Sequence, residues 1–540
     1  MVAELSAAQQ RSQDPQLLAE LSFPSLLTLL PLSLPIPDNT PPSPKRHYRS
    51  RYVYLGYQDL RDDISLWAIL SPSDLALRLI DFSSLEAPLA HKLYSPSAKG
   101  QTPFHPVSMF LLFSWRLSNK WNRVECLRNL ANPANADYRQ RFGFSEGNYP
   151  TEGGLRYFET QLGSESANDL IAQTVELAQA VHCISQQATE HGILAADGML
   201  HDAASRMRCS SVSEDCYKPA PRPCKAKDEK GRKGCDCDEL ACAEVCKYAT
   251  PRDHEARFIV YQGHNQTDSP NALRPKVTQS SSEKTKPSSG KPRYGYRSVC
   301  ERLIDPLFRT SWVVADELLS ANAPEDQAAT DLMKDVVSDY DWVKWEFAVA
   351  DAGEGREPFL STAYELGLRR VVGLRAAEGD RKTEVQALRG YDDKGIPLCQ
   401  HGYRLHPNGW DSQRKRHKWC CRLTCEKEME RPAPDCPYRQ NESEHGFVRD
   451  IGLAFGDGST RLVRDVPYGS PLWERLYGRA RNAAEERNSQ FEGLGLKRMP
   501  VYGLPRVRAT VTVVDIWVNL MTIIRLIREA VLAANGPPPT

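Results

Sequence analysis

Three carboxylates stand where the chain can present them to a common site. Asp197 follows the apolar run ILAA and Asp351 follows WEFAVA, the pattern of buried strands that each deliver an acid. Glu485 lies in a long helical segment. Taken singly these positions are ordinary, because many strands end in aspartate, and Asp202 is a rival to Asp197. Brought together, their oxygens would suit hard cations such as Mg²⁺ and phosphodiester cleavage.

The segment from Trp473 to Leu496 predicts one amphipathic helix with an unusual polar face. Steps of four, four, three and four align the polar side chains Tyr477, Arg481, Glu485, Asn488 and Glu492. The other flank is apolar and consists of Trp473, Leu476, Ala480, Ala484 and Phe491. A surface ion pair between Arg481 and Glu485 is the simpler explanation of this spacing.

The string YGRARNAAEERNSQFEGLGLKR resembles the C-terminal catalytic helix of DDE transposases from bacterial insertion sequences. In that family a tyrosine, an arginine, the catalytic glutamate and a lysine are spaced along one helix. The arginine and glutamate carry over as Arg481 and Glu485. Two positions depart from the family: Tyr477 is one residue too far from Arg481, and Glu492 stands where the lysine belongs.

The resemblance implies a catalytic triad in a ribonuclease-H-like α/β core, a mixed sheet flanked by helices. Asp197 matches the aspartate at the end of the first strand, Asp351 matches the one at the end of the fourth, and Glu485 completes the set. Two Mg²⁺ or Mn²⁺ ions would bind there, with Asp197 bridging both. Glu486 is the rejected rival, since it lies about 100° around the helix from Glu485.

DNA contacts are expected along the same helix and just after it. The expected site residues are Tyr477, Arg481, Asn488, Lys497 and Arg498, the last two replacing the missing lysine. Further phosphate contacts are expected from Arg475, Arg479, Arg487, Arg506 and Arg508.

Strands and helices that can position these acids follow in a regular order. We expect strands at 294–304, 311–318, 345–353 and 369–375, and helices at 324–340 and 358–367. A connecting helix is expected over 167–191. Three strands, a helix, then alternating strand and helix is the order of a ribonuclease-H-like fold.

The predicted organisation has five parts. Residues 1–50 form a Pro-rich mobile lead, and 51–165 an N-terminal all-α domain that resembles the one preceding many transposase cores. Its role is DNA binding or dimer contact, or simply a helical cap. The core spans 166–376 and 464–540, interrupted by Cys-rich insertions at 205–293 and 377–463.

The 15 cysteines cluster mainly in the two insertions. The first insertion holds seven without a C-x-x-C pair, so it is either a zinc site or a loop of free thiols. In the second, Cys399, Cys421, Cys425 and Cys436 predict a structural zinc site, beside a basic run rich in tryptophan. The absence of a secretory pattern favours a reducing, cytoplasmic and nucleoid-associated location.

Net charge and hydropathy limit the kinds of partner that the sequence predicts. Lysine plus arginine and aspartate plus glutamate both number 69, so DNA binding must come from local basic surfaces. No membrane span is expected, because prolines break residues 21–37 and Asp515, Asn519 and Arg525 interrupt the last apolar helix.

We therefore expect a transposase that cleaves and joins strands of duplex DNA, at element ends and target, as a homodimer. The alternatives are a non-catalytic, zinc-stabilised DNA-binding derivative and a structure-specific nuclease without strand transfer.

Overall fold

The computed structural model describes most of the predicted core and the N-terminal helices. The residues described are 30–36, 40, 46–94, 101–204, 253, 255–260, 292–351, 357–373, 388–391, 397–399, 402–411, 416–421, 448–451 and 471–535.

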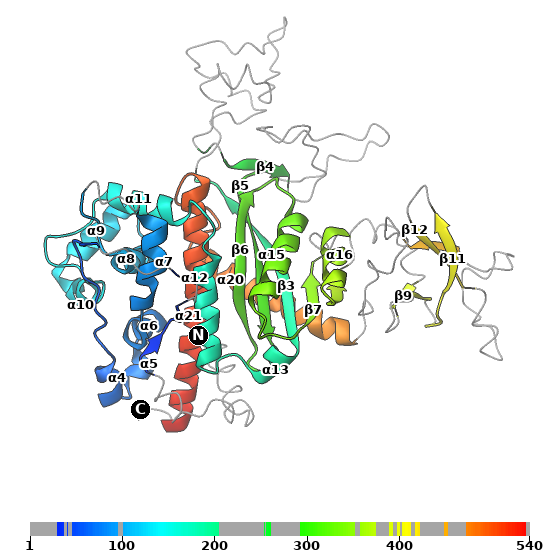
Figure 1. Ribbon diagram of the computed structural model, residues 1–540, viewed down its shortest axis with the longest axis horizontal. Coiled ribbons are helices and arrows are strands. Elements are labelled where there is room, and N and C mark those ends of the chain that lie inside the picture. Colours follow the sequence, from blue (N-terminus) through cyan, green and yellow to red (C-terminus); the bar gives the residue numbers. More distant parts are fainter. Residues whose placement is uncertain are drawn as a thin grey trace, which may run out of the picture.

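A six-stranded mixed sheet forms the centre of the molecule (Figure 1). Its strands are β3 (Gly192–Asp202), β4 (Arg257–Val260), β5 (Pro292–Asp305), β6 (Thr310–Ser320), β7 (Trp345–Ala350) and β8 (Arg369–Val372). They lie in the order β4-β5-β3-β7-β8, and β6 pairs with β5. β5 is antiparallel to β3, β4 and β6, whereas β3, β7 and β8 are parallel. The prediction of a mixed sheet flanked by helices is confirmed.

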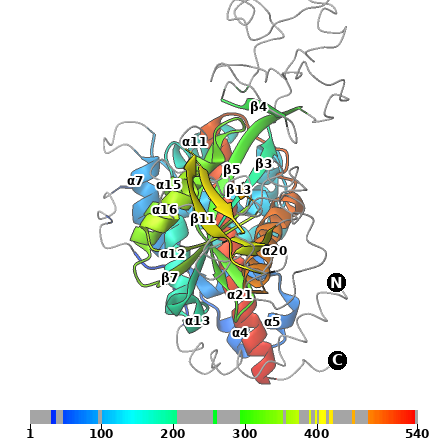
Figure 2. The same cartoon turned by 90° about the vertical axis from the view of Figure 1, so that its right-hand side faces the viewer.

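Both faces of this sheet are covered, which explains why its strands are apolar runs without strict alternation. The helices α15 (Glu325–Asp339) and α16 (Glu357–Glu365) pack together on one face. On the other face, α20 (Pro471–Gly493) crosses β8, β7, β3 and β5 (Figures 1 and 2). Its Leu476, Ala480 and Ala483 pack on alternate strand residues, among them Ile193 and Val349.

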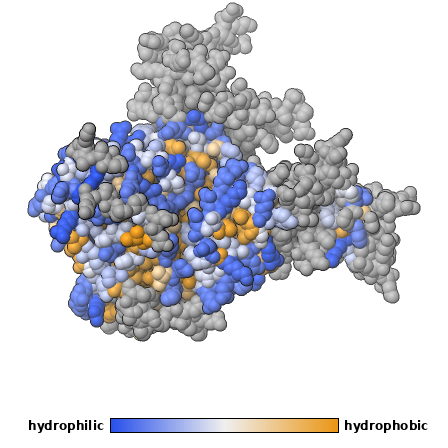
Figure 3. Space-filling model, in the orientation of Figure 1, coloured by the Kyte–Doolittle hydropathy of each residue, from blue (hydrophilic) through white to orange (hydrophobic). Residues whose placement is uncertain are grey.

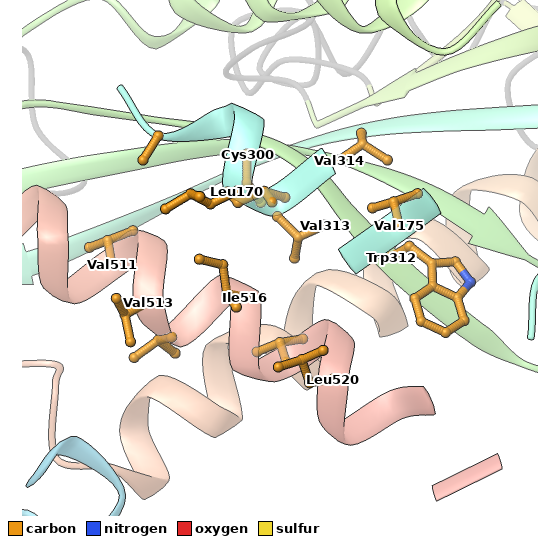
Figure 4. Close-up of a cluster of buried hydrophobic side chains, with 14 of the residues drawn as sticks. Leu170, Val175, Cys300, Trp312, Val313, Val314, Val511, Val513, Ile516 and Leu520 are labelled. Atoms are coloured by element: carbon orange, nitrogen blue, oxygen red, sulfur yellow. The ribbon is translucent and has the colours of Figure 1, made fainter. Parts of the chain in front are cut away.

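The outer edge of β6 is closed by two helices, α12 (Asn168–Ala180) and α21 (Leu504–Asn535). The Asn519 side chain accepts from the Val313 N–H at 2.9 Å and donates to the Val313 carbonyl at 2.8 Å. It thus gives hydrogen-bond partners to backbone groups at the edge of the sheet. Figure 4 shows Val511, Val513, Ile516 and Leu520 packed against residues of α12 and β6. α21 therefore belongs to the sheet's core.

All but one of the remaining helices lie on the far side of α21 from the sheet (Figure 1). They are α4 (Gln58–Asp62), α5 (Leu66–Ile69), α6 (Pro72–Leu79), α7 (Glu86–Leu93), α8 (Pro106–Ser118), α9 (Arg123–Ala131), α10 (Ala136–Arg141), α11 (Glu152–Leu162) and, beside the sheet, α13 (Gln186–Glu190). Their buried side chains join those of α21 and the sheet in one continuous hydrophobic cluster.

α21 is, within the described residues, the one helix long and apolar enough to cross a membrane. Its most apolar window has a mean hydropathy of 1.7, and 83% of that window is buried inside the protein. Two of the polar residues that interrupt it are buried and bonded, because Asp515 binds Arg487 and Asn519 binds β6, whereas Arg525 is partly exposed. On the face drawn in Figure 3 the described surface is mostly hydrophilic, with apolar residues in small groups. The helix is thus packed as expected.

The second insertion contributes two small sheets to the described structure. β9 (Leu388–Tyr391) pairs with β10 (Pro397–Cys399), and β11 (His406–Asp411), β12 (Arg416–Cys420) and β13 (Val448–Ile451) form a three-stranded antiparallel sheet.

Three expectations need correction. The helix predicted over 167–191 is two helices, because His182 adopts a positive φ of 57° and Ser185 caps α13 while binding Asp305 at 2.8 Å. The first strand continues five residues beyond Asp197 instead of ending there. Within the expected mobile lead, β1 (Leu32–Ser33) pairs with β2 (Ile80–Asp81), and Leu32 is buried.

Candidate active site

Asp197 lies on β3, and Asp351 directly follows β7, the neighbouring parallel strand. The register pairs Ala195 of β3 with Val349 of β7, and each aspartate follows two residues later. Ile193, Ala195 and Val349 pack under α20, so the same alternation directs Asp197 toward that helix. Adjacent strands are about 4.8 Å apart. Two acids distant in sequence therefore meet at the C-terminal end of β7.

Competing charges act on the Asp197 carboxyl group. Burial raises its pKa most strongly; Arg487 and Arg302 lower it, the charge of Asp351 raises it, and the hydrogen bond from Asn488 lowers it. The electrostatic effect of Asp351 on Asp197 indicates that the two carboxyl groups lie near each other. Such a pair is relieved by a cation between or beside its oxygens.

Asn488 brings α20 into this site. Its Nδ2 donates to Oδ2 of Asp197 at 3.3 Å. Its Oδ1 is buried and accepts no hydrogen bond from any described residue. An unpaired buried carbonyl oxygen is costly, and amide oxygens are ligands of hard cations. Asn488 thus adds a third oxygen donor, of a different type, next to the two aspartates.

Glu485 lies one turn before Asn488 but does not join the aspartates. Its Oε1 is 3.3 Å from Nε of Arg481, and both side chains are more than half exposed. Burial acts to lower the pKa of Arg481, but Tyr477, Glu485 and Asp197 raise it and prevail. Arg481 is therefore the link between the glutamate and Asp197. Among the described residues, no three His, Cys, Asp or Glu side chains form a group that could hold a metal.

The two rival acids lie elsewhere. Glu486 occupies the opposite flank of α20, where with Arg479 and Asn482 it lines a cavity of about 400 Å³ beside the turn after β5. Asp202 lies five residues beyond Asp197 on β3, roughly 16 Å along the strand, and binds Arg293 at 2.8 Å. Neither is placed to replace Glu485 or Asp197.

The predicted DNA-binding residues fall into three settings. Tyr477 stacks on Trp473 with ring centroids 4.4 Å apart. Lys497 binds Glu492 at 2.6 Å, and Arg498 donates to the Ala204 carbonyl at 3.1 Å. The backbone of residues 497–499 hydrogen-bonds to Asp202, the last residue of β3, so Lys497 and Arg498 lie beside the end of the strand that carries Asp197. The Lys497 charge is, however, already neutralised.

Arg487 is a wrong prediction as a phosphate contact. It is fully buried, and its Nε and Nη2 each lie 2.7 Å from an oxygen of Asp515 on α21. Arg302 of β5 is also buried and donates to the Ala483 carbonyl of α20 and to Ser311. Both arginines hold the polar helix against its neighbours. Asp515 in an apolar stretch of α21 and Arg302 in β5 are charged residues of the kind that need a buried partner, which the sequence alone does not identify.

Two of the four predicted zinc ligands are among the described residues. Cys399 and Cys421 are half-buried, whereas Cys425 and Cys436 lie outside the described residues, as do the seven cysteines of the first insertion. No protein-family model matches the chain, and no curated protein matches it. Any functional assignment therefore depends on the geometry around Asp197.

Proposed function

We propose that this chain is a DDE-type DNA transposase that cuts a DNA strand at Asp197 and Asp351 and joins a 3′-hydroxyl to target DNA. The observation that carries the proposal is the register of β3 and β7, which sets the two aspartates side by side under α20. The hydrogen bond from Asn488 to Asp197 supports it, because it ties the polar face of the helix to the same acids.

The sheet supports a ribonuclease-H-like core. β6, β5 and β3 are successive antiparallel neighbours, and β7 and β8 continue in parallel with β3. Helices separate β6 from β7 and β7 from β8, which is the element order of that fold. The N-terminal helices would then be the all-α part that precedes it.

The donors suit hard divalent cations, Mg²⁺ or Mn²⁺. The carboxylates of Asp197 and Asp351 and the free amide oxygen of Asn488 would hold them. When bound, such ions activate the attacking oxygen and stabilise the leaving one. Glu485 would complete the set by leaving Arg481, which would then be free to orient a phosphate.

The proposal includes the partners expected from the sequence. The protein would bind duplex DNA at the element ends and at the target, as a dimer in the cytoplasm beside the nucleoid. Its second insertion would hold a structural zinc on Cys399, Cys421, Cys425 and Cys436, because thiolates suit zinc whereas the cleavage reaction suits Mg²⁺ on oxygen donors.

A non-catalytic DNA-binding derivative is the second candidate. Two ion pairs favour it: Glu485 is bound to Arg481, and Lys497 to Glu492. In this state neither the third acid nor the substitute cation is available. Such a protein would bind DNA without cutting it.

Substitution of the aspartates tests the proposal. Asp197→Asn and Asp351→Asn should each lower Mg²⁺-dependent nicking at least about 100-fold, since bound metal stabilises the transition state by several kcal/mol. Both should also weaken Mn²⁺ binding in calorimetry. Asp202→Asn, on the same strand but outside the site, is the matched control. Glu485→Gln should abolish nicking and Glu486→Gln should not.

Two results would decide against the proposal. If Asp197→Asn nicks as the unaltered protein does, the site is wrong. If the unaltered protein binds DNA tightly and never nicks it, the second candidate is correct.

A further inference from the structure

A second polar stripe runs along α20, on the flank opposite Arg481 and Glu485. It includes Arg475, Arg479, Asn482 and Glu486, separated from the first stripe by the apolar residues that pack on the sheet. Arg475 and Arg479 line a cavity of about 560 Å³ between α20, the start of β3 and the turn after β5. This cavity lies away from the aspartates, beside Ile193, which precedes Asp197 by about 13 Å along the strand.

The cavity is strongly cationic. Its charged lining residues other than His191 are Arg309, Arg369, Arg475, Arg479 and Glu346. Glu346 is already engaged by Arg369 at 3.4 Å and by His191 at 3.0 Å. Arg309, Arg475 and Arg479 form no hydrogen bond or ion pair with any residue that the structure describes. Positive charge therefore exceeds negative charge in this cavity, and no described residue pairs with these three arginines.

The crowding of these arginines has an electrostatic signature. Burial lowers the pKa of Arg479, and the charges of Arg475 and Arg309 lower it further. Arg309 is held at the cavity by the turn from β5 to β6, where it has a positive φ of 52°. Repulsion among fixed guanidinium groups is removed when an anion binds between them, and the guanidinium fork matches two phosphate oxygens at once.

We infer that Arg309, Arg475 and Arg479 form a phosphate-binding pocket for the DNA backbone, a few nucleotides from the bond positioned at Asp197. This inference depends on the proposed function for its choice of DNA over a free phosphate compound. The apolar walls of the pocket, Leu472, Leu476 and Phe347, suit the sugar beside a phosphate. The pocket gives α20 contacts with one strand on both of its flanks.

The test measures DNA affinity at several salt concentrations without divalent metal, on a fluorescent duplex. Arg475→Gln and Arg479→Gln, both at exposed helix positions, should each reduce the slope of log affinity against log salt by about 0.9. Between 50 and 200 mM salt, each variant should thus lose about 3.5-fold less affinity than the unaltered protein. Arg479→Lys keeps the charge and should restore the slope. Lys334→Gln, on α15 across the sheet, is the control that should leave it unchanged.

Each outcome separates this inference from the proposed function. An unchanged slope in both glutamine variants overturns the pocket, even if Asp197→Asn abolishes nicking. A reduced slope supports the pocket, even if Asp197→Asn nicks normally and the catalytic assignment fails. If inorganic pyrophosphate binds in calorimetry and the arginine variants abolish that binding while DNA is not bound, the pocket serves a free phosphate compound and the DNA assignment is overturned.

Discussion

The pairing of Glu492 with Lys497 limits DNA binding beside the end of β3. Their charged atoms are 2.6 Å apart, and both side chains are about half exposed. Glu492→Gln should release Lys497 for a phosphate, so the salt slope should rise by up to about 0.9 and DNA affinity should increase. Lys497→Ala should change the slope by less than that in the unaltered background. Equal slopes for Glu492→Gln and the unaltered protein would show that Lys497 is not a latent phosphate contact.

Asp316 predicts a pH dependence of stability. Burial, with the nearby charge of Asp515, raises its pKa from an ordinary 3.8 to about 8, so the folded state takes up a proton that the unfolded state lacks between these values. Its contribution to stability is therefore present below pH 4 and is lost as pH rises through about 8. Asp316→Asn should show a shallower decline in the free energy of unfolding across this range, measured by urea titration. A parallel decline in both proteins would contradict the assignment.

At the residue scale, the strand pattern could predict that Asp197 and Asp351 approach each other, but the helix period could not decide whether Glu485 joins them or pairs with Arg481. Asp197 and Asp351 end apolar runs, and strand pairing alone brings such residues together. The partners of Arg487 and Lys497 were not predictable, because a helix period assigns a residue to a face without saying whether that face meets solvent or another helix. The arginine pocket likewise needed Arg309, which is distant in sequence from α20.

α20 and α21 are joined by one buried ion pair, and this pair should dominate the stability of their packing. Arg487 and Asp515 are both fully buried and share two hydrogen bonds of 2.7 Å. Arg487→Met or Asp515→Leu alone should cost about 3 to 5 kcal/mol of unfolding free energy, because each leaves an uncompensated buried charge. The double variant should recover most of that loss. These values come from urea unfolding followed by circular dichroism.

A surface ion pair on α20 provides the control for these two substitutions. Arg481→Ala removes a surface pair on the same helix, which should cost under about 1 kcal/mol. If the single buried substitutions cost no more than Arg481→Ala, the pair does not hold the helices together.

At the element scale, strands and helices with clear apolar periods were predictable, and their ends were set by contacts across the chain. Ser185 is a preferred helix N-cap and so a sign in the sequence that the helix over 167–191 breaks, but its hydrogen bonds to Asp305 could not be predicted. The extension of β3 past Asp197 depends on the five residue pairs with β5 from Gly198 to Asp202. Local pattern therefore predicts which elements form, and tertiary hydrogen bonds decide where they stop.

The whole molecule should unfold as one unit over its described helices and sheet. α21 contacts α6, α8 and α11 as well as β6, and all share one hydrophobic cluster. The fluorescence of the buried tryptophans Trp67 in α5 and Trp312 in β6 reports on the two sides. Single-tryptophan proteins retaining either one should give the same urea midpoint. Midpoints that differ by more than about 1 M would indicate separate domains.

The position of α21 in the chain has a consequence for synthesis. Every helix and strand that α21 packs against precedes it in the chain. α21 therefore leaves the ribosome after both the N-terminal helices and the sheet that it joins. At about 5 to 20 residues per second, the edge of β6 and the inner faces of the N-terminal helices stay uncovered for many seconds. During that interval the nascent chain exposes the apolar surfaces and the strand edge that chaperones bind. Translation of the last described helix is therefore the step that commits this protein to its fold.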